Sequence, residues 1–203
     1  MKNTKKILFS LFAISLLSLT GCTKDEDFEL YSVKKTIFHE EFTNSQDGTI
    51  LDTPLWANVA QTGTKKWSEQ VYSDNGYAEF TSYQSGQAVN VGWLISPPID
   101  MNKQDGEKLV FQSAQNFLKL ADNSLELMVS TDYDGTNFST SSWEKLNAIV
   151  PTPETEKYLF INSGEIDLSQ YSGTLYFAFR VRGSGTNTNL TGTYQIDNIR
   201  IFY

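Results

Sequence analysis

The chain contains a single histidine, His39, and a single cysteine, Cys22, so few side chains are available for nucleophilic catalysis. A Ser-His-Asp triad would have to use His39 as its base. His39 lies in TIFHEEF, residues 36–42, where apolar and polar residues alternate and predict a strand. A strand histidine usually packs against neighbours or lies at an edge, so His39 gives little support to an enzyme.

Paired carboxylates are the next candidates for chemistry, and GEIDLS, residues 164–169, contains two of them. Glu165 and Asp167 resemble the opening of the E-x-D-x-x-E motif of jelly-roll glucanases. Retaining hydrolysis needs two carboxyl groups about 5–5.5 Å apart. Gln170 occupies the position of the second glutamate, so this motif cannot divide the nucleophile and acid roles.

The segment TDYDGTN, residues 131–137, resembles part of an EF-hand calcium loop through Asp132, Asp134 and Gly135. An EF-hand closes with a bidentate acidic side chain, and here that region holds Trp143 with Glu144 beside it. A hairpin turn with Asp-Gly in its tightest part is the preferred interpretation.

Aromatic rings in turn-like stretches are candidates for binding. Trp56 and Trp67 flank a polar segment, and Tyr72 and Tyr77 follow among Ser, Asn and Gly residues. A solvent-facing ring stacks on the face of a sugar, while neighbouring amides and carboxylates bind the hydroxyl groups. We predict these four residues as ligand-binding, with Trp67 as the best candidate for an exposed platform.

A packing role is the alternative for each tryptophan. Trp93 and Trp143 lie in stretches that predict strands and are expected in the core. On the same reasoning, Trp56 and Trp67 would cover one end of a sandwich instead of facing solvent.

Short strands are the elements that would position these residues. Alternating stretches are separated by turn compositions such as SDNG and GSGTNTN, and no segment predicts a helix of three turns. About nine or ten short strands without intervening helices predict an all-β, antiparallel, two-sheet sandwich. The clearest alternating stretches are residues 36–42, 76–83, 108–117, 124–131 and 174–182.

Five sequence blocks, taken in their order along the chain, resemble the choice-of-anchor J or cleaved-adhesin family. The domains of that family are MAM-like jelly rolls similar to carbohydrate-binding modules. The resemblance runs from Phe38 to the end of the chain. It implies a jelly-roll β-sandwich with an adhesive or binding role and no fixed ligand, and it assigns Asp167 to a structural turn. The blocks are WLISPPIDM, LELMVSTDYDG, SWEKL, EIDLSQYSGTLYFAFR and YQIDNIRI.

The same resemblance implies that the first and last strands lie near each other, which bears on Glu40 and Asp197. By the period of two, Glu40 shares a face with Phe38, and Asp197 shares a face with Ile199. If Phe38 and Ile199 point into the core, both carboxylates point inward as well. Two inward carboxylates close together need a cation, and Ca²⁺ takes oxygen ligands of this kind. We predict a structural calcium held by Glu40 and Asp197, with Asp47 as a further ligand.

Other interpretations of these carboxylates remain open. Glu40 or Asp197 would need no cation if it lay at a strand end in water or capped a turn. Ile196 breaks the alternation of the last strand and indicates a bulge, which changes the facing of Asp197. Glu41, on the opposite face of its strand, is an alternative ligand.

The first residues form a targeting signal. Three lysines precede the apolar run ILFSLFAISLLSL, which is shorter than the roughly 20 residues that span a bilayer. LTGC, residues 19–22, resembles the bacterial lipobox, which implies acylation of Cys22 after removal of residues 1–21. An ordinary secretory signal followed by a free thiol is the alternative.

Residues 22–35 are expected to be a tether. TKDEDFE, which follows Cys22, resembles the acidic export tag of Bacteroidetes surface lipoproteins, and a solvated acidic linker is the alternative. A lipidated Cys22 leaves no thiol for catalysis or for a Cys/His zinc site. We therefore predict an outer-membrane lipoprotein exposed at the cell surface, with residues 36–203 as its single folded domain.

The charge of the chain limits its partners. The formal net charge is −8, which repels phosphate backbones and argues against nucleic acid. The favoured hypothesis is a non-catalytic surface protein for adhesion or glycan capture that meets the membrane only through its lipid. The second hypothesis is a structural or assembly subunit that binds a partner protein, and a glycoside hydrolase is the third.

Overall fold

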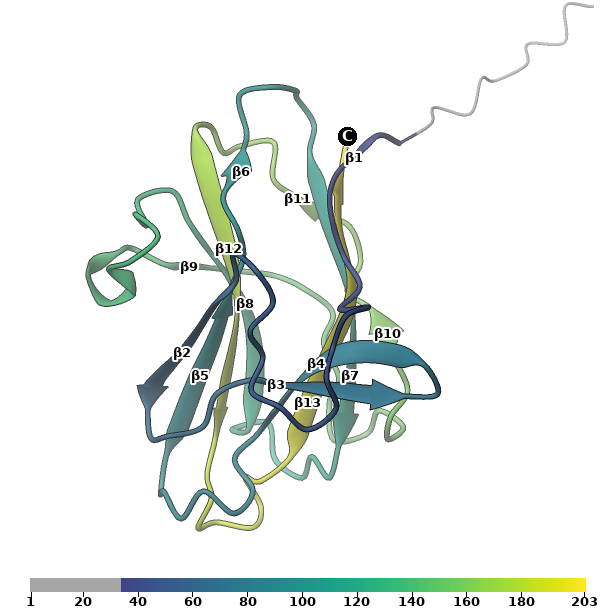
Figure 1. The fold of residues 1–203 in the computed structure, drawn as a ribbon, viewed down its shortest axis with the longest axis vertical. Helices are drawn as coiled ribbons and strands as arrows, with labels where there is room; N and C mark the ends of the chain where they lie inside the picture. The colour runs from purple at the N-terminus through teal and green to yellow at the C-terminus, as the bar shows by residue number, and fades with distance from the viewer. Residues whose placement is uncertain (1–33) are drawn as a thin grey trace, which may run out of the picture. The chain divides into compact units, whose positions relative to one another are not determined.

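The computed structural model describes residues 34–203, which form one compact unit. The targeting signal, Cys22 and most of the predicted tether lie outside the described residues. The regular elements of the described chain are strands in two antiparallel sheets and one short 3₁₀ helix at Phe138–Thr140 (Figure 1). This confirms the predicted all-β, two-sheet sandwich.

The first sheet has seven strands, in the order β10-β7-β13-β4-β3, with β1 also paired to β13 and β11 to β7. The central strand β13 therefore pairs with β4, β7 and β1. Its strands are β1 (Thr36–Glu40), β3 (Ser68–Tyr72), β4 (Asn75–Thr81), β7 (Lys108–Asn116), β10 (Ile161–Asn162), β11 (Ile166–Asp167) and β13 (Thr193–Phe202).

The second sheet has six strands, in the order β2-β5-β12-β8-β9, with β6 also paired to β12. The segment around Glu144, which reads as strand-like in the sequence, forms the edge strand β9. The strands are β2 (Ala57–Thr62), β5 (Asn90–Ile95), β6 (Ile99–Asp100), β8 (Ser124–Ser130), β9 (Glu144–Leu146) and β12 (Thr174–Gly183).

The main core lies between the sheets and follows the alternation of the sequence. In β12, alternate residues are fully buried, and β7, β8 and β13 add their own apolar rows. Burying such side chains contributes about 1.5–3 kcal/mol each before entropic costs. The β12 row consists of Leu175, Phe177, Phe179 and Val181.

A second apolar cluster covers the opposite face of the second sheet. Trp93 is 4% exposed, and its ring lies 5.2 Å from that of Trp143, centroid to centroid. Tyr133 packs on Trp143 from the loop between β8 and β9. The expected buried strand position is confirmed for Trp93, whereas Trp143 lies just before β9 and is only partly buried against this cluster.

The loop that resembles an EF-hand is a self-bonded turn. Asp132 accepts hydrogen bonds from the Ser130 hydroxyl and the Ser142 amide, and Asp134 accepts them from the amides of Thr136 and Asn137. These bonds hold the pKa of both carboxyls below the usual range. Since β8 and β9 pair antiparallel, this segment does connect two paired strands, but the connection covers residues 131–143 and includes the 3₁₀ helix, so it is not the tight hairpin turn preferred from the sequence.

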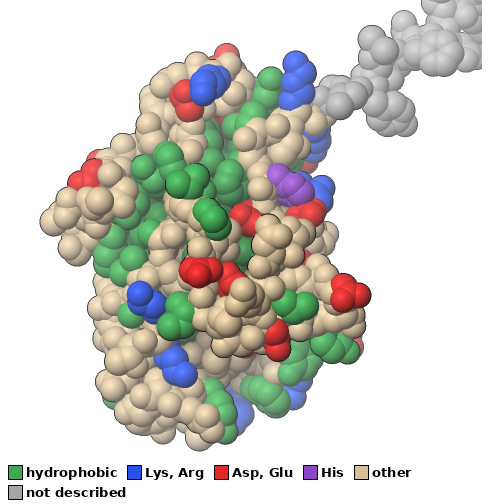
Figure 2. All heavy atoms as spheres, viewed as in Figure 1, with side chains coloured by type: hydrophobic (Ala, Val, Ile, Leu, Met, Phe, Trp, Pro, Cys, Tyr) green, Lys and Arg blue, Asp and Glu red, His purple; other side chains and the backbone are tan. Residues whose placement is uncertain are grey.

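The two ends of the described chain meet at one pole. Lys35 and Tyr203 exchange backbone hydrogen bonds in both directions at 3.1 Å, and β1 runs antiparallel to β13 (Figure 1). Within the described residues there is no helix of the length and apolarity needed to cross a membrane. On the face shown in Figure 2, charged side chains are spread between apolar ones.

Candidate ligand-binding groove on the outer face of a sheet

The outer face of the first sheet carries a groove that crosses β3, β4, β13 and the end of β7. One part has a volume of about 610 Å³ and an adjoining part about 690 Å³. Tyr77, Tyr158 and Gln195 line both parts, so we treat them as one feature, the sheet groove. The first part is completed by Tyr72, Asn75 and Phe160, and the second by Glu79, Thr81, Tyr83, Asn116, Phe117, Lys119, Thr188, Thr191 and Thr193.

Strand periodicity explains which residues face this groove. In β4, Tyr77 and Glu79 alternate with the fully buried Ala78 and Phe80. In β13, Gln195 alternates with Tyr194 and Ile196 and pairs with Glu79 across the strands, although Gln195 is itself only 2% exposed. The same alternation that builds the core therefore sends polar side chains and tyrosines to the outer face.

Aromatic rings surround the polar floor of the groove. Three rings that line the groove stand well into solvent. They belong to Tyr72, Tyr158 and Phe117, which are 75%, 58% and 57% exposed. Tyr77 packs edge-on against Phe160, with ring centroids 5.9 Å apart. Exposed rings of this size retain a flat apolar surface for a ligand.

Two of these aromatic residues have unusual backbone conformations. Phe117 and Tyr158 have φ of 56° and 62°, a region that bulky residues seldom adopt. Hydrogen bonds to one residue of β7 hold the segments: the Tyr158 amide donates to the Gln115 carbonyl, and the Leu118 amide to the Gln115 side chain. Strain of this kind tends to occur at functional sites.

Three polar side chains of the groove, those of Glu79, Gln195 and Asn116, lie among its aromatic rings. Gln195 Nε2 donates to Glu79 Oε2 at 2.8 Å. Burial raises the pKa of Glu79, the Gln195 bond partly opposes this, and the charge of Asp47 raises it further. Oδ1 of Asn116 is buried and accepts no hydrogen bond from the described residues. The groove thus combines polar side chains, partly bonded to one another, with apolar rings.

The structure divides the four predicted ring residues. Tyr72 and Tyr77 line the groove, whereas Trp67 is 0% exposed and packs against Phe80 at 5.7 Å. Trp56 is also buried, with its Nε1 donating to Glu40. The prediction that Trp67 is an exposed platform, with Trp56 as a second ring, is therefore wrong because both rings are removed from water inside the sandwich.

Sequence reasoning missed three rings of the groove. Tyr158 and Phe160 lie in a segment without regular structure before β10, and Phe117 follows directly after β7. The only signal was a pair of aromatic residues within a Pro- and Thr-rich stretch. Their placement depends on hydrogen bonds to β7 from a distant part of the chain.

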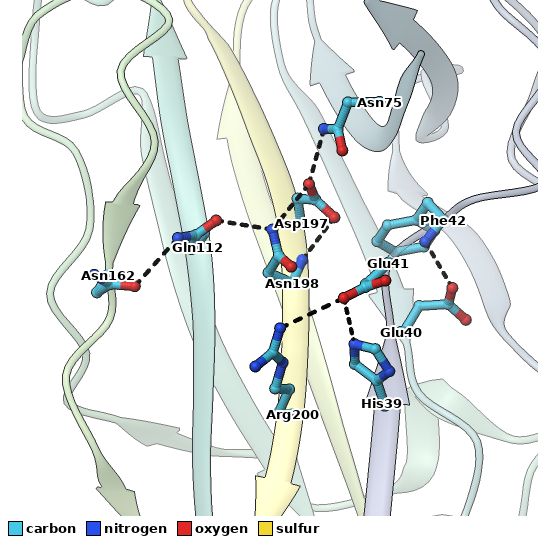
Figure 3. A network of polar contacts seen from close by, with 10 residues as sticks. All are labelled: His39, Glu40, Glu41, Phe42, Asn75, Gln112, Asn162, Asp197, Asn198 and Arg200. Atoms are coloured by element: carbon cyan, nitrogen blue, oxygen red, sulfur yellow. Dashed lines mark hydrogen bonds and ion pairs between the residues drawn. The ribbon is translucent and has the colours of Figure 1, made fainter.

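Two of the carboxylates proposed for calcium, Glu40 and Asp197, lie among polar side chains of β1 and β13, and Asp197 is bonded to Asn75 of the groove lining (Figure 3). Asp197 is 2% exposed and accepts hydrogen bonds from Asn75 and from the backbone of Asn198, at 2.9 and 2.6 Å. Burial is the main cause of its raised pKa, opposed by these bonds and reinforced by the charges of Glu41 and Glu40.

The other two proposed calcium ligands, Glu40 and Asp47, have hydrogen-bond partners of their own. Glu40 accepts hydrogen bonds from the Phe42 amide and Trp56, and Asp47 accepts one from the Val71 amide. Within residues 34–203, no three acidic or histidine side chains gather as metal ligands, so Asp47 does not complete a three-carboxylate set. The bulge indicated by Ile196 occurs slightly later, between Asp197 and Arg200.

His39 and the glucanase-like carboxylates have structural roles. His39 is half exposed beside Glu41, with Nε2 and Oε1 2.7 Å apart, and its imidazole is visible at the surface (Figure 2). Glu165 pairs with Lys34 and Lys108, while Asp167 accepts the Ser169 amide hydrogen. The turn implied for Asp167 is therefore present.

Comparison with known proteins places the fold and leaves the family open. No family model matches the chain, and no curated protein matches it. Among solved structures, the K2 cleaved-adhesin domain of Lys-gingipain has a TM-score of 0.51 and 16% identity over 82% of this chain and 97% of that domain. This likeness, with the two antiparallel sheets, establishes a jelly-roll sandwich.

Two further solved structures have TM-scores just below 0.5. The K1 cleaved-adhesin domain from Porphyromonas gingivalis W83 has 22% identity and a TM-score of 0.49, covering 82% of this chain and 97% of that one. The xylan-binding CBM22-2 domain of Paenibacillus barcinonensis Xyn10C has 11% identity and a TM-score of 0.48, covering 81% and 98%. At these identities the ligand must be argued from the site itself.

Proposed function

We propose that this protein is a non-catalytic binding module that holds a polysaccharide in the sheet groove. The observation that carries the proposal is the combination, in one groove, of exposed rings with hydrogen-bonding side chains on a rigid sheet. Tyr72, Tyr77 and Tyr158 provide apolar faces for stacking, and Glu79 and Gln195 provide polar groups for hydroxyls. A few convergent polar groups beside apolar surface are typical of a small-ligand site.

Hydrolysis is disfavoured by the chemistry of the lining. Glu79 is the one carboxylate among the described residues that line the groove. Glycoside hydrolysis uses two, separated by about 5–5.5 Å in retaining enzymes or about 6.5–9.5 Å in inverting enzymes. A lone carboxylate suits recognition of hydroxyl groups better than cleavage of a glycosidic bond.

A protein partner is the competing function, and the shape of the surface separates the two. A partner protein is expected to bind a flat apolar patch of several hundred Å². The exposed rings described here instead lie along a groove with polar residues on its floor. This arrangement favours an extended polyhydroxylated chain.

The first test measures binding of the purified protein to a glycan array and to soluble polysaccharides by affinity electrophoresis. Tyr158→Ala should weaken binding about 2- to 12-fold because an aromatic contact contributes about 0.5–1.5 kcal/mol. Tyr203→Ala removes a 41%-exposed tyrosine beside the paired chain ends and serves as the matched control. Equal binding by the two variants, or no binding to any glycan, would contradict the proposal.

We also propose that Glu40 and Asp197 hold a structural Ca²⁺. The support is that Asp197 is buried, has acidic neighbours, and forms no ion pair within the described chain. The side-chain oxygen of Asn75 and nearby carbonyls would supply the neutral ligands that Ca²⁺ accepts. The hydrogen bonds now made by both carboxylates would rearrange when the ion binds.

Calorimetry with Ca²⁺ and with EDTA tests this site. At 100 times Kd, Ca²⁺ should stabilise the fold by about 2.7 kcal/mol, and Asp197→Asn should abolish the effect. Asp47→Asn should keep it, because the Asp47 carboxylate is bonded to the Val71 amide instead. If the melting temperature changes neither with Ca²⁺ nor with EDTA, the proposed calcium site is refuted.

A lipid anchor at Cys22 is the final part of the proposal. Its support is the sequence alone: a basic start, a short apolar run and LTGC, followed by an acidic stretch. The anchor would hold the sheet groove outside the cell, where polysaccharides occur.

A further inference from the structure

Glu79 occupies a distinctive place in the sheet groove. It lies within β4, where it pairs with Gln195 of β13 on one side and Ser68 of β3 on the other. Its Oε2 accepts the hydrogen bond from Gln195, and its Oε1 accepts none from the described residues. One acceptor oxygen of this carboxylate is therefore free for a ligand.

The charges around Glu79 leave its own charge uncompensated. Glu79 forms no ion pair within residues 34–203, and the charge of Asp47 acts on it with the same sign. Lys119 also lines this part of the groove, and Lys157 lies over the Phe117 ring at 4.7 Å. Lys119 is exposed and so is well screened, whereas Glu79 is partly buried in the floor of the groove, where screening is weaker.

We infer that Glu79 makes the sheet groove selective for neutral polysaccharides over polysaccharides that carry uronate carboxylates. This inference rests on the proposed function and adds the ligand class. The free Oε1 accepts a hydrogen bond from a sugar hydroxyl, and bonds to a charged acceptor are among the stronger ones. A carboxylate in the same subsite has no proton to donate at neutral pH and meets a like charge.

The test uses matched polymers that differ in one group. The probes are a soluble β-glucan, a galactomannan and a starch glucan, each compared with the same polymer oxidised from the C6 hydroxymethyl group to the carboxylate. Affinity electrophoresis measures the ratio of neutral to oxidised affinity for the wild-type protein, Glu79→Gln and Asp105→Asn. Asp105 is exposed in the turn before β7, outside the groove lining, so its variant makes the same change in net charge.

The wild-type protein should bind the oxidised polymer at least about tenfold more weakly than the neutral one. Glu79→Gln should reduce this ratio to about two- to threefold, since the amide keeps a partner for Gln195 but carries no charge. Asp105→Asn should leave the ratio unchanged. Raising NaCl from 0.05 to 0.5 M should leave most of the wild-type ratio in place, because the partly buried Glu79 is screened less than the exposed charges of the surface.

The possible failures are distinguishable. If the wild-type protein binds a neutral polymer, Tyr158→Ala weakens that binding, and Glu79→Gln does not change the ratio, then the selectivity is refuted and the groove function stands. If the wild-type protein binds no neutral polymer, the proposed function fails and the selectivity fails with it.

Discussion

At the scale of single residues, Glu69 shows how one carboxylate obscures a pattern. Trp67 and Glu69 are 0% and 4% exposed, while Tyr72 is 75% exposed on the opposite face of β3. An acid at an inward position makes the alternation of SEQVY ambiguous, so the sequence did not reveal which face was buried. Tyr72, predicted as ligand-binding, lines the groove, whereas Trp67, predicted as an exposed platform, is buried.

Glu69 is buried because it organises the loop before β2. Its carboxylate accepts hydrogen bonds from the amides of Gln46 and Asp52, at 2.6 and 3.4 Å. Glu69→Ala leaves these donors without their partner and should lower the free energy of unfolding by about 1–3 kcal/mol. Urea denaturation measures this, with Glu154→Ala, an exposed acid, as the control. Equal midpoints for the two variants would show that the loop does not depend on Glu69.

At the scale of elements, the regular strands were predictable and the irregular segments were not. The apolar rows of β8 and β12 follow the period of two over seven and ten residues, enough to fix their inward face. The two-residue strands β10 and β11 have no such period and exist through pairing with β7. Tyr158 and Phe160 belong to the irregular segment before β10, so two of the four aromatic residues that line the first part of the groove lay beyond sequence reasoning.

Close packing of the two sheets fixes the spacing of these elements. A Cβ placed on Gly92 of β5 would lie 2.0 Å from the ring of Phe80 in β4, which is fully buried. Gly92→Ala should therefore destabilise the fold by about 1–3 kcal/mol through overpacking. Chemical denaturation measures the loss, and Thr62→Ala at the exposed end of β2 is the control. A neutral effect of Gly92→Ala would mean that the Phe80 ring has room to move.

At the scale of the whole molecule, fold class followed from sequence while the location of the groove did not. Strand number, turn composition and the lack of helices indicate a sandwich, but each sheet has an outer face, and both carry aromatic residues. On the second sheet, the loop between β8 and β9 covers the rings around Trp93. On the first sheet, the rings remain open, and only the three-dimensional arrangement distinguishes the two.

The proposed anchor belongs to this scale as well. Cys22→Ser should move the protein from the membrane fraction to the soluble fraction and remove labelling by a radioactive fatty acid. Protease treatment of intact cells checks exposure, since a surface protein is degraded and an internal one is protected. Membrane association that persists in the variant would refute the lipid anchor.

The pairing of the chain ends has a mechanical consequence. β1 leads from Lys34 into the sheet and is paired along its length to β13, which also carries groove residues such as Gln195 (Figure 1). If the protein is held through the segment before Lys34 while a polymer in the groove is dragged by flow, the tension runs along β1. The hydrogen bonds between β1 and β13 are then loaded together in shear, and strands loaded in this way separate at higher force than strands peeled apart bond by bond.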